Sequence, residues 1–175
     1  MKHVLTMAAL LCVACANAAE HSGPHAHGAP YAGMEKREIK ALSDQQVADL
    51  HAGRGMALAL PAELNGYPGP SHVLELSRQL ALTPDQQKRT KEMFETMQRN
   101  AVGLGQRVID RERELDALFA QKNATGDSVM AAAAAAARAQ GELRALHLRY
   151  HVAMHELLTP EQLVRYNQLR GYASK

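Results

Sequence analysis

The feature that most constrains the fold is a long run of apolar residues at helical spacing after Pro84. Positions 94, 97, 101, 104, 108, 115 and 118 are apolar and follow a three-four spacing that only Arg111 interrupts. This spacing predicts one continuous helix from Pro84 to about Gln121, with a coiled-coil-like apolar seam. Such a helix must bury its seam against another element, and a second long helix is the simplest partner.

A second long helix follows in the sequence after a short loop. The loop spans residues 123–128, with Thr125 or Asp127 as the next cap, and the alanine block 131–137 begins a helix that runs to Leu157. These elements predict an all-α fold built on a long antiparallel helical hairpin. Only two Phe and no Trp are available for a core. We therefore expect self-association, with a homodimer as the predicted state.

The same helix-start pattern, Leu-Thr-Pro-acid-Gln, occurs at residues 82–86 and again at residues 158–162. In this pattern Thr is the N-cap, Pro occupies the first helical position, and Gln reaches back to the cap. The acid lies at the positive end of the helix dipole. The second copy predicts a short final helix from Pro160 to about Arg170. Residues 43–46, Ser-Asp-Gln-Gln, are a weaker version of the pattern.

Short elements precede the first long helix. Helical patterning begins near Glu35, continues through Leu50 and stops at two glycines, Gly53 and Gly55. Residues 65–70, Asn-Gly-Tyr-Pro-Gly-Pro, must form a turn, since two prolines and two glycines cannot continue a helix. Ser71 is then predicted to cap a short helix that reaches about Leu80. Within the long helix, Gly103 and Gly105 predict a bend or a close helix crossing.

The N-terminus predicts export. Lys2 and an apolar run precede Ala-Asn-Ala at residues 16–18, which together form a Sec-type signal peptide for the periplasm. An alternative interpretation is a lipoprotein anchored at Cys15. With cleavage after Ala18, the predicted regions are a signal peptide at residues 1–18, a disordered His-rich tail at 19–33 and a helical domain at 34–172. Cleavage after residue 18 would leave no cysteine, because Cys12 and Cys15 are the only two.

The paired Leu-Thr-Pro-acid-Gln starts on an exported hairpin resemble the Spy/CpxP family, which is characterised by LTxxQ motifs. The segment from Tyr31 to Leu76, with its Leu-Asn-Gly-Tyr-Pro-Gly-Pro turn at 64–70, resembles the heavy-metal-sensor branch of that family. The similarity covers about residues 31–172. It implies a curved periplasmic dimer that acts as an ATP-independent chaperone, as a modulator of envelope-stress signalling, or as a sensor of Zn, Cu, Ni or Co.

The histidines of the second long helix carry the sharpest metal-site signal. His147, His151 and His155 recur every four residues, so they form one slanting row beside the apolar seam. Neighbouring imidazoles at this spacing can share one ion, while further ligands must come from another segment, with His72, Glu75 and Glu95 as candidates. The resemblance also favours His72 and this row. The alternative is that the three rings only pack against the seam.

A second metal candidate depends on cleavage after Ala18. The mature chain would then begin Ala19-Glu20-His21, and a free amine, two backbone amides and the His21 imidazole suit square-planar Cu(II) or Ni(II). Lipidation at Cys15 would abolish this site. The alternative is a polar tail that merely contains histidines. No organic cofactor is expected.

A chaperone function is the alternative to metal sensing. Apolar and basic side chains of the first long helix would then contact unfolded periplasmic proteins; the candidates are Met93, Met97, Leu104, Arg99 and Arg107. These Met and Leu residues could equally be ordinary core. A third interpretation is an adaptor that binds a membrane sensor kinase or an anti-sigma partner.

Catalysis and nucleic-acid binding are not expected. The sequence has no Gly-x-Ser-x-Gly elbow, no phosphate-binding glycine loop and no His-Glu-x-x-His, and its carboxylates are interspersed with basic residues. Removal of residues 1–18 takes away Lys2 alone among the twenty Lys and Arg, which leaves nineteen against eighteen Asp and Glu. A balance this close to neutral offers no basic surface for nucleic acid.

Overall fold

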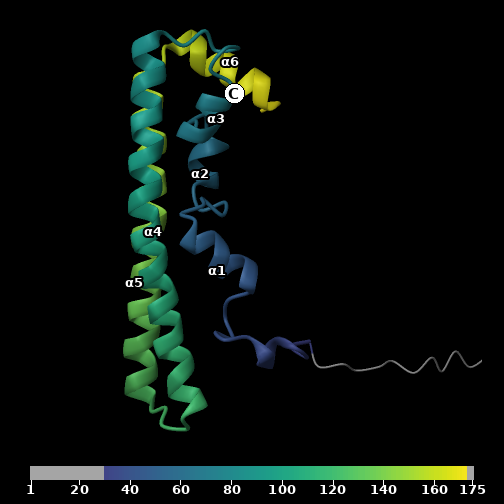
Figure 1. The fold of residues 1–175 in the computed structure, drawn as a ribbon, viewed down its shortest axis with the longest axis vertical. Helices are drawn as coiled ribbons and strands as arrows, with labels where there is room; N and C mark the ends of the chain where they lie inside the picture. The colour runs from purple at the N-terminus through teal and green to yellow at the C-terminus, as the bar shows by residue number, and fades with distance from the viewer. Residues whose placement is uncertain (1–29, 173–175) are drawn as a thin grey trace, which may run out of the picture. The chain divides into compact units, whose positions relative to one another are not determined.

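Two long antiparallel helices, α4 (Pro84–Ala120) and α5 (Gly126–Leu157), dominate the fold (Figure 1). The structure, a computed structural model, describes residues 30–172, of which those from Gly33 onward form one unit. The shorter helices are η1 (Met34–Lys36), α1 (Asp44–His51), α2 (Leu60–Glu63), α3 (Pro70–Glu75) and α6 (Pro160–Arg170). No strand occurs in the described part of the chain. The predicted all-α fold with a long helical hairpin is confirmed.

Capping boxes begin four of the helices. Ser43, Thr83, Thr125 and Thr159 each accept a hydrogen bond from the backbone N–H three residues on, and the side chain there accepts one back. Each box satisfies two backbone donors that a helix start would otherwise leave without partners. The predicted starts at Thr83 and Thr159 are confirmed, and Thr125, rather than Asp127, caps α5.

The two Leu-Thr-Pro-acid-Gln boxes lie side by side, although they are 76 residues apart in the chain. Gln86 Nε2 donates to Gln162 Oε1 at 2.8 Å, and Gln162 Nε2 donates back to Gln86 Oε1 at 3.0 Å. Each amide also donates to a main-chain carbonyl, of Leu157 at 3.1 Å and of Leu80 at 3.2 Å. The repeated Gln therefore both caps its own helix and ties the start of α4 to the start of α6.

Two predictions about the short helices are wrong. The helix expected from Glu35 begins only at Asp44, because Ser43 takes an extended conformation (φ −76°, ψ 159°) that an interior helical residue cannot have. The helix expected after Ser71 starts at Pro70 instead, since proline suits the first helical position and Gly69 serves as the N-cap. This helix ends at Glu75 and does not reach Leu80.

Residues 44–76, here called the strap, run along one side of the hairpin (Figure 1). Helices α1 and α3 of the strap contact α4, and α2 and α3 contact α5. The crossing of α1 over α4 depends on Gly105, where an added Cβ would lie 2.4 Å from the Leu50 carbonyl oxygen. Gly103 faces open space. The predicted close helix crossing is thus confirmed, and the lack of a side chain at Gly105 permits it.

Two hydrophobic clusters hold the strap and α6 to the hairpin. The first lies beneath α1 and includes Leu50, Ala101, Val108, Ile109 and Leu143. The second lies beneath α3 and α6 and includes Val73, Leu80, Met154, Leu158 and Tyr166. Along α5, the segment between Leu146 of the first cluster and Met154 of the second carries two buried histidines.

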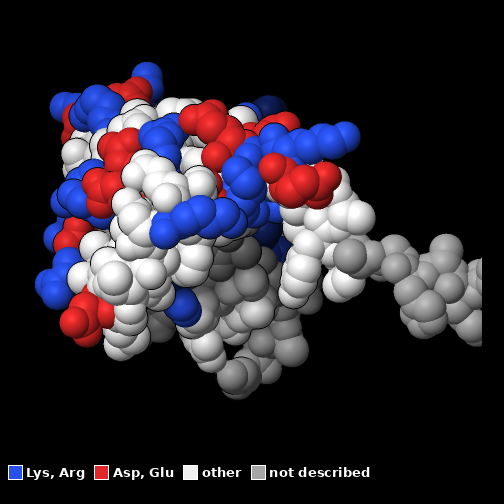
Figure 2. Space-filling model, turned by 90° about the horizontal axis from the view of Figure 1, so that it is seen from below, with Lys and Arg blue, Asp and Glu red and all other residues white. Residues whose placement is uncertain are grey.

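Charged side chains of both signs are interspersed on the surface that Figure 2 shows, in keeping with the near-neutral charge balance. Within residues 30–172, no helix combines the length and the apolar composition that a membrane crossing needs.

Candidate metal site under the strap

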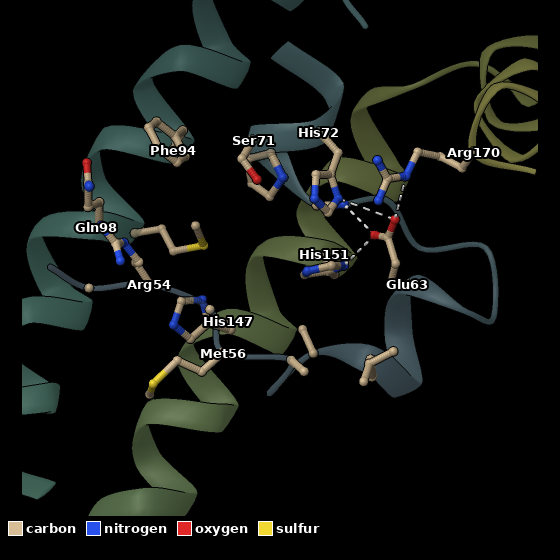
Figure 3. Close-up of a pocket in the computed structure, with 18 of the residues that line it drawn as sticks. Arg54, Met56, Glu63, Ser71, His72, Phe94, Gln98, His147, His151 and Arg170 are labelled. Carbon is tan, nitrogen blue, oxygen red and sulfur yellow. Dashed lines mark hydrogen bonds and ion pairs between the residues drawn. The ribbon is translucent and has the colours of Figure 1, made fainter. Parts of the chain in front are cut away.

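A cavity of about 470 Å³ lies between the strap, α4 and α5 (Figure 3). The strap lines it with Arg54, Met56, Glu63 and His72, among others. The facing walls come from the two long helices, which contribute Phe94, Met97, Gln98, His147 and His151. Two histidines from one helix therefore face strap residues that lie far away in the sequence.

His147 has a ring nitrogen that lacks a hydrogen-bond partner. Its side chain is buried, with 3% exposed, and Nε2 has no hydrogen-bond partner in the described structure. Burial, aided by the charge of His151, lowers the pKa of His147 below its usual range. The ring is therefore neutral at pH 7. A neutral imidazole with an unpaired nitrogen is the form that binds metal ions.

His151 is held in one orientation by the strap. Its Nδ1 lies 2.7 Å from the carbonyl oxygen of Tyr67, and because a carbonyl only accepts, Nδ1 must donate. In the neutral ring, Nε2 then keeps the lone pair. Gly69 packs against the Cε1–Nε2 edge of the His151 ring, since an added Cβ there would lie 2.9 Å from Cε1 and 3.0 Å from Nε2.

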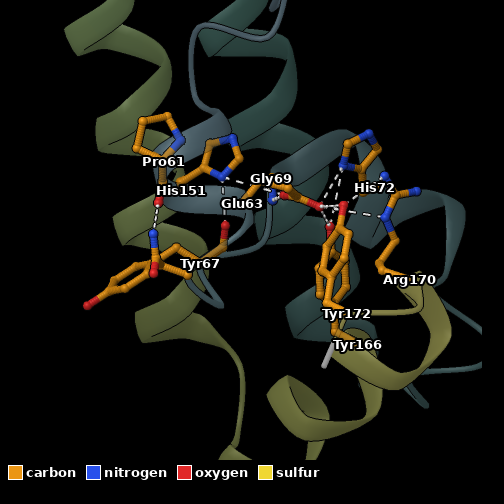
Figure 4. A network of polar contacts seen from close by, with 10 residues as sticks. Pro61, Glu63, Tyr67, Gly69, His72, His151, Tyr166, Arg170 and Tyr172 are labelled. Atoms are coloured by element: carbon orange, nitrogen blue, oxygen red, sulfur yellow. Dashed lines mark hydrogen bonds and ion pairs between the residues drawn. The ribbon is translucent and has the colours of Figure 1, made fainter. Parts of the chain in front are cut away.

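Glu63 is the centre of a buried polar network (Figure 4). Its Oε1 accepts from the hydroxyl of Tyr166 at 2.5 Å and of Tyr172 at 3.1 Å, and its Oε2 accepts from the backbone N–H of Gly69 at 3.2 Å. Arg170 Nε lies 3.6 Å from Oε1. These contacts join α2 of the strap to α6 and to the residues that follow it.

The network also holds Glu63 in its charged form. Burial raises the pKa of this carboxyl, but hydrogen bonds from His72, Tyr166 and Tyr172, together with the charge of His72, outweigh burial and bring the pKa to about 2. The charge of Glu63 is in turn one reason why the pKa of Tyr166 is raised, after burial and the hydrogen bond between them. At neutral pH the network therefore contains a carboxylate and a protonated phenol.

His72 is anchored in the same way as His151. Its Nδ1 is 3.3 Å from the hydroxyl oxygen of Tyr166 and 3.4 Å from Oε1 of Glu63. Because the Tyr166 hydroxyl donates its hydrogen bond to Glu63, the phenol oxygen accepts one from His72 Nδ1. In the neutral ring, Nε2 of His72 is then the nitrogen with the lone pair. A histidine whose other nitrogen donates to a carboxylate or carbonyl is the usual arrangement in metal sites.

The remaining predicted metal ligands lie elsewhere. His155 stacks on the ring of Tyr67, with 4.4 Å between the ring centroids, and it does not line the cavity. Glu75 is exposed and also outside the cavity lining, and His21, like the predicted signal peptide and Cys15, lies outside the described residues. Among residues 30–172, no three His, Cys, Asp or Glu side chains are grouped closely enough to hold a metal ion.

Glu63, which makes the most polar contacts in the site, was not predicted from the sequence as a site residue. A signal was present, since Glu63 is a lone acid in the otherwise apolar segment 56–64. Gly69 and Tyr67 were recognised only as turn residues. Their contacts with His151 depend on how the turn packs against α5, which no local pattern reveals.

The predicted client-binding residues lie in three places: the cavity, the two hydrophobic clusters and a groove on the hairpin. Met97 is buried and lines the cavity, while Met93 and Leu104 are half-buried and pack against the two hydrophobic clusters. Arg99 and Arg107, with Leu104, line a shallow open groove between α4 and α5 on the hairpin. Arg107 also forms an ion pair with Glu142 at 3.1 Å.

Comparisons of the chain with protein-family models, with curated proteins and with solved structures find no match.

Proposed function

We propose that this protein is an exported, periplasmic metal-binding stress protein of the Spy/CpxP type. It senses or buffers a transition-metal ion such as Zn, Cu, Ni or Co, and it is a binding protein rather than an enzyme. The observation that carries the proposal is the pair His147 and His151, which line one cavity from neighbouring turns of α5. The unpaired, buried Nε2 of His147 is its most specific feature.

The surroundings of the two rings support binding of an ion. His151 donates from Nδ1 to Tyr67, which fixes the ring and leaves Nε2 to coordinate. The close approach of Gly69 would be impossible for any residue with a Cβ unless the ring moved. His72, anchored through Tyr166 and Glu63, is the third imidazole of the cavity lining.

Metal binding at this cavity would couple to the position of the strap. The cavity lies between the strap and the hairpin, and His72 would have to move toward His147 and His151 to share an ion with them, which would tie the strap to α5. Such an ion would stabilise this arrangement by an amount that grows with the logarithm of its affinity for it. A membrane sensor or anti-sigma partner that contacts the strap could read this change.

The proposal is tested by calorimetric titration of the mature protein with Zn(II) and Co(II), and with Ni(II) and Cu(II) for comparison. Micromolar binding is expected in the wild type and should be lost in a His147→Ala/His151→Ala variant. His155→Ala is the matched control, since it removes a histidine of the same row that lies outside the cavity, and its binding should match the wild type. Zn(II) and Co(II) are decisive, because the predicted His21 site favours Cu(II) and Ni(II). Binding that is absent, or that persists in the double variant, would refute the proposal.

A second candidate function, ATP-independent chaperone activity, is favoured by the open groove that Arg99, Leu104 and Arg107 line on the hairpin. Its mixture of basic and apolar side chains suits unfolded acidic clients. An Arg99→Ala/Arg107→Ala variant should then suppress aggregation of a denatured acidic protein less well than the wild type. Under this interpretation the His147→Ala/His151→Ala variant keeps full activity in that assay.

A further inference from the structure

We propose that the preferred ion at this site is soft and monovalent, Cu(I) or Ag(I), and that the thioether of Met97 joins His147 and His151 as a ligand. This inference rests on the proposed function and names the ion that the site takes. Two observations carry it: the donor atoms that line the cavity, and the charge balance around them.

The free donors of the cavity are soft or neutral. Met97 projects from α4, is 7% exposed and lines the same cavity as the two histidines of α5. A second thioether, that of Met56, enters the lining from the strap. Thioether sulfur combined with imidazole nitrogen favours Cu(I) over the harder divalent ions, which take carboxylate and water oxygens readily. Helix α4 and the strap thus each contribute a soft donor to the cavity that the histidine pair lines.

The one carboxylate in the cavity lining, Glu63, is already engaged. Two tyrosine hydroxyls and a backbone N–H donate to its oxygens, and Arg170 lies beside it. Recruitment of this carboxylate to a divalent ion would break those contacts and leave buried donors without partners. Glu63 lies 3.4 Å from Nδ1 of His72 and 3.8 Å from Nδ1 of His151, so it orients these rings instead of neutralising an ion.

The charges around the cavity disfavour a doubly charged ion. Arg170 compensates Glu63, and the other cation of the lining, Arg54, is paired with Asp49 at 2.6 Å. An ion bound by His147, His151 and Met97 consequently keeps its full charge among neutral donors. The free-energy cost of burying an ion grows with the square of its charge, so desolvation costs far less for a monovalent ion than for a divalent one.

The experiment compares Cu(I) with Zn(II) on the mature protein. Cu(I) affinity is measured without oxygen, in competition with bathocuproine disulfonate, with Ag(I) as a redox-inert check; Zn(II) affinity is measured by competition with a zinc chelator. We expect Cu(I) to bind roughly a hundredfold more tightly than Zn(II). X-ray absorption at the copper edge should show sulfur as well as nitrogen neighbours in the wild type.

Met97→Leu is the decisive variant, because leucine preserves an apolar side chain of similar volume and removes only the sulfur. It should weaken Cu(I) binding about tenfold and abolish the sulfur signal, with Zn(II) affinity unchanged. Met93→Leu is the matched control: this methionine lies one turn away on α4 outside the cavity, and its replacement should leave Cu(I) binding intact.

The outcomes separate this inference from the proposed function. If Zn(II) binds as tightly as Cu(I), and both require His147 and His151, the inference is wrong and the metal site stands. If the wild type shows no sulfur neighbour, or if Met97→Leu folds and binds Cu(I) normally, Met97 is not a ligand and the inference fails. If neither ion binds through the two histidines, the proposed function itself fails.

Discussion

Gly69→Ala tests whether the strap holds His151 ready for an ion. The backbone of Gly69, at φ −87° and ψ 148°, is open to alanine, so the substitution adds a methyl group without backbone strain. That methyl would meet Cε1 of His151 at 2.9 Å and Nε2 at 3.0 Å. Because carbon contacts are favourable only from about 3.5 Å, the ring must move by roughly 0.5 Å. The movement disrupts the hydrogen bond from Nδ1 to Tyr67.

The expected effect is large on metal binding and small on stability. Loss of the His151 hydrogen bond costs about 0.5–1.5 kcal/mol, which the reduced entropy of the unfolded alanine chain partly offsets by about 0.4–1 kcal/mol. The free energy of unfolding should therefore change by less than about 1 kcal/mol. Disturbing the groups that orient a metal ligand usually weakens metal affinity about 10–100-fold, and that range is expected here.

Two measurements and a matched control decide this prediction. Metal affinity is measured by chelator competition, and NMR of the imidazole nitrogens reports whether His151 is still protonated at Nδ1. Gly55→Ala is the control, since its Cβ would lie 3.9 Å from Nδ1 of His147, an ordinary contact, and its affinity should stay at the wild-type level. Equal affinities for Gly69→Ala and the wild type, or an equal loss in both variants, would refute the argument that the Gly69 contact positions the ring.

Two further predictions concern stability. Gly105→Ala should lower the free energy of unfolding by about 1–3 kcal/mol or more, because its Cβ would meet backbone atoms of Leu50. Gly103→Ala, whose Cβ would face open space, should raise the free energy of unfolding by up to about 1 kcal/mol. Urea unfolding followed by circular dichroism compares the two variants, and equal effects would contradict the close crossing. Glu63, whose pKa falls to about 2, should contribute on the order of 3 kcal/mol that is present above its unfolded pKa near 4.5 and is lost as pH falls from there toward 2. Unfolding curves between pH 7 and pH 2 should show this loss in the wild type and not in Glu63→Gln; parallel profiles would argue against a charged Glu63.

The helices were predictable because their signals are local. The apolar spacing after Pro84 and the Thr-Pro caps specify where α4 and α6 begin, and both depend only on residues within one or two turns. The same local logic failed at Glu35, where the apolar spacing predicted the start of a helix, whereas the helix begins only after the Ser43 cap. A capping box is a stronger signal than periodicity over two turns, because it fixes a specific backbone conformation.

The site was predictable only in part. His147 and His151 were identified because four-residue spacing places them on one face of a helix, yet the same spacing includes His155, which stacks on Tyr67 instead. Which histidines face the cavity depends on where the strap crosses α5, and that is a long-range property. Glu63 and Gly69 acquire their roles from the same crossing, so no pattern in their own neighbourhoods could reveal them.

The Glu63 network explains how the fold and the proposed site depend on one another. Glu63 accepts hydrogen bonds from the hydroxyls of Tyr166 and Tyr172, and through Tyr166 it determines which nitrogen of His72 donates. Packing α6 against the strap therefore orients an imidazole that itself lies in the strap. Under the proposed function, an ion that drew His72 and α5 together would stabilise the contact between strap and hairpin, by about 2.7 kcal/mol at a free concentration one hundred times its dissociation constant. The packing of the strap would then report on the ion, which is the property that a metal sensor requires and that a passive metal store does not need.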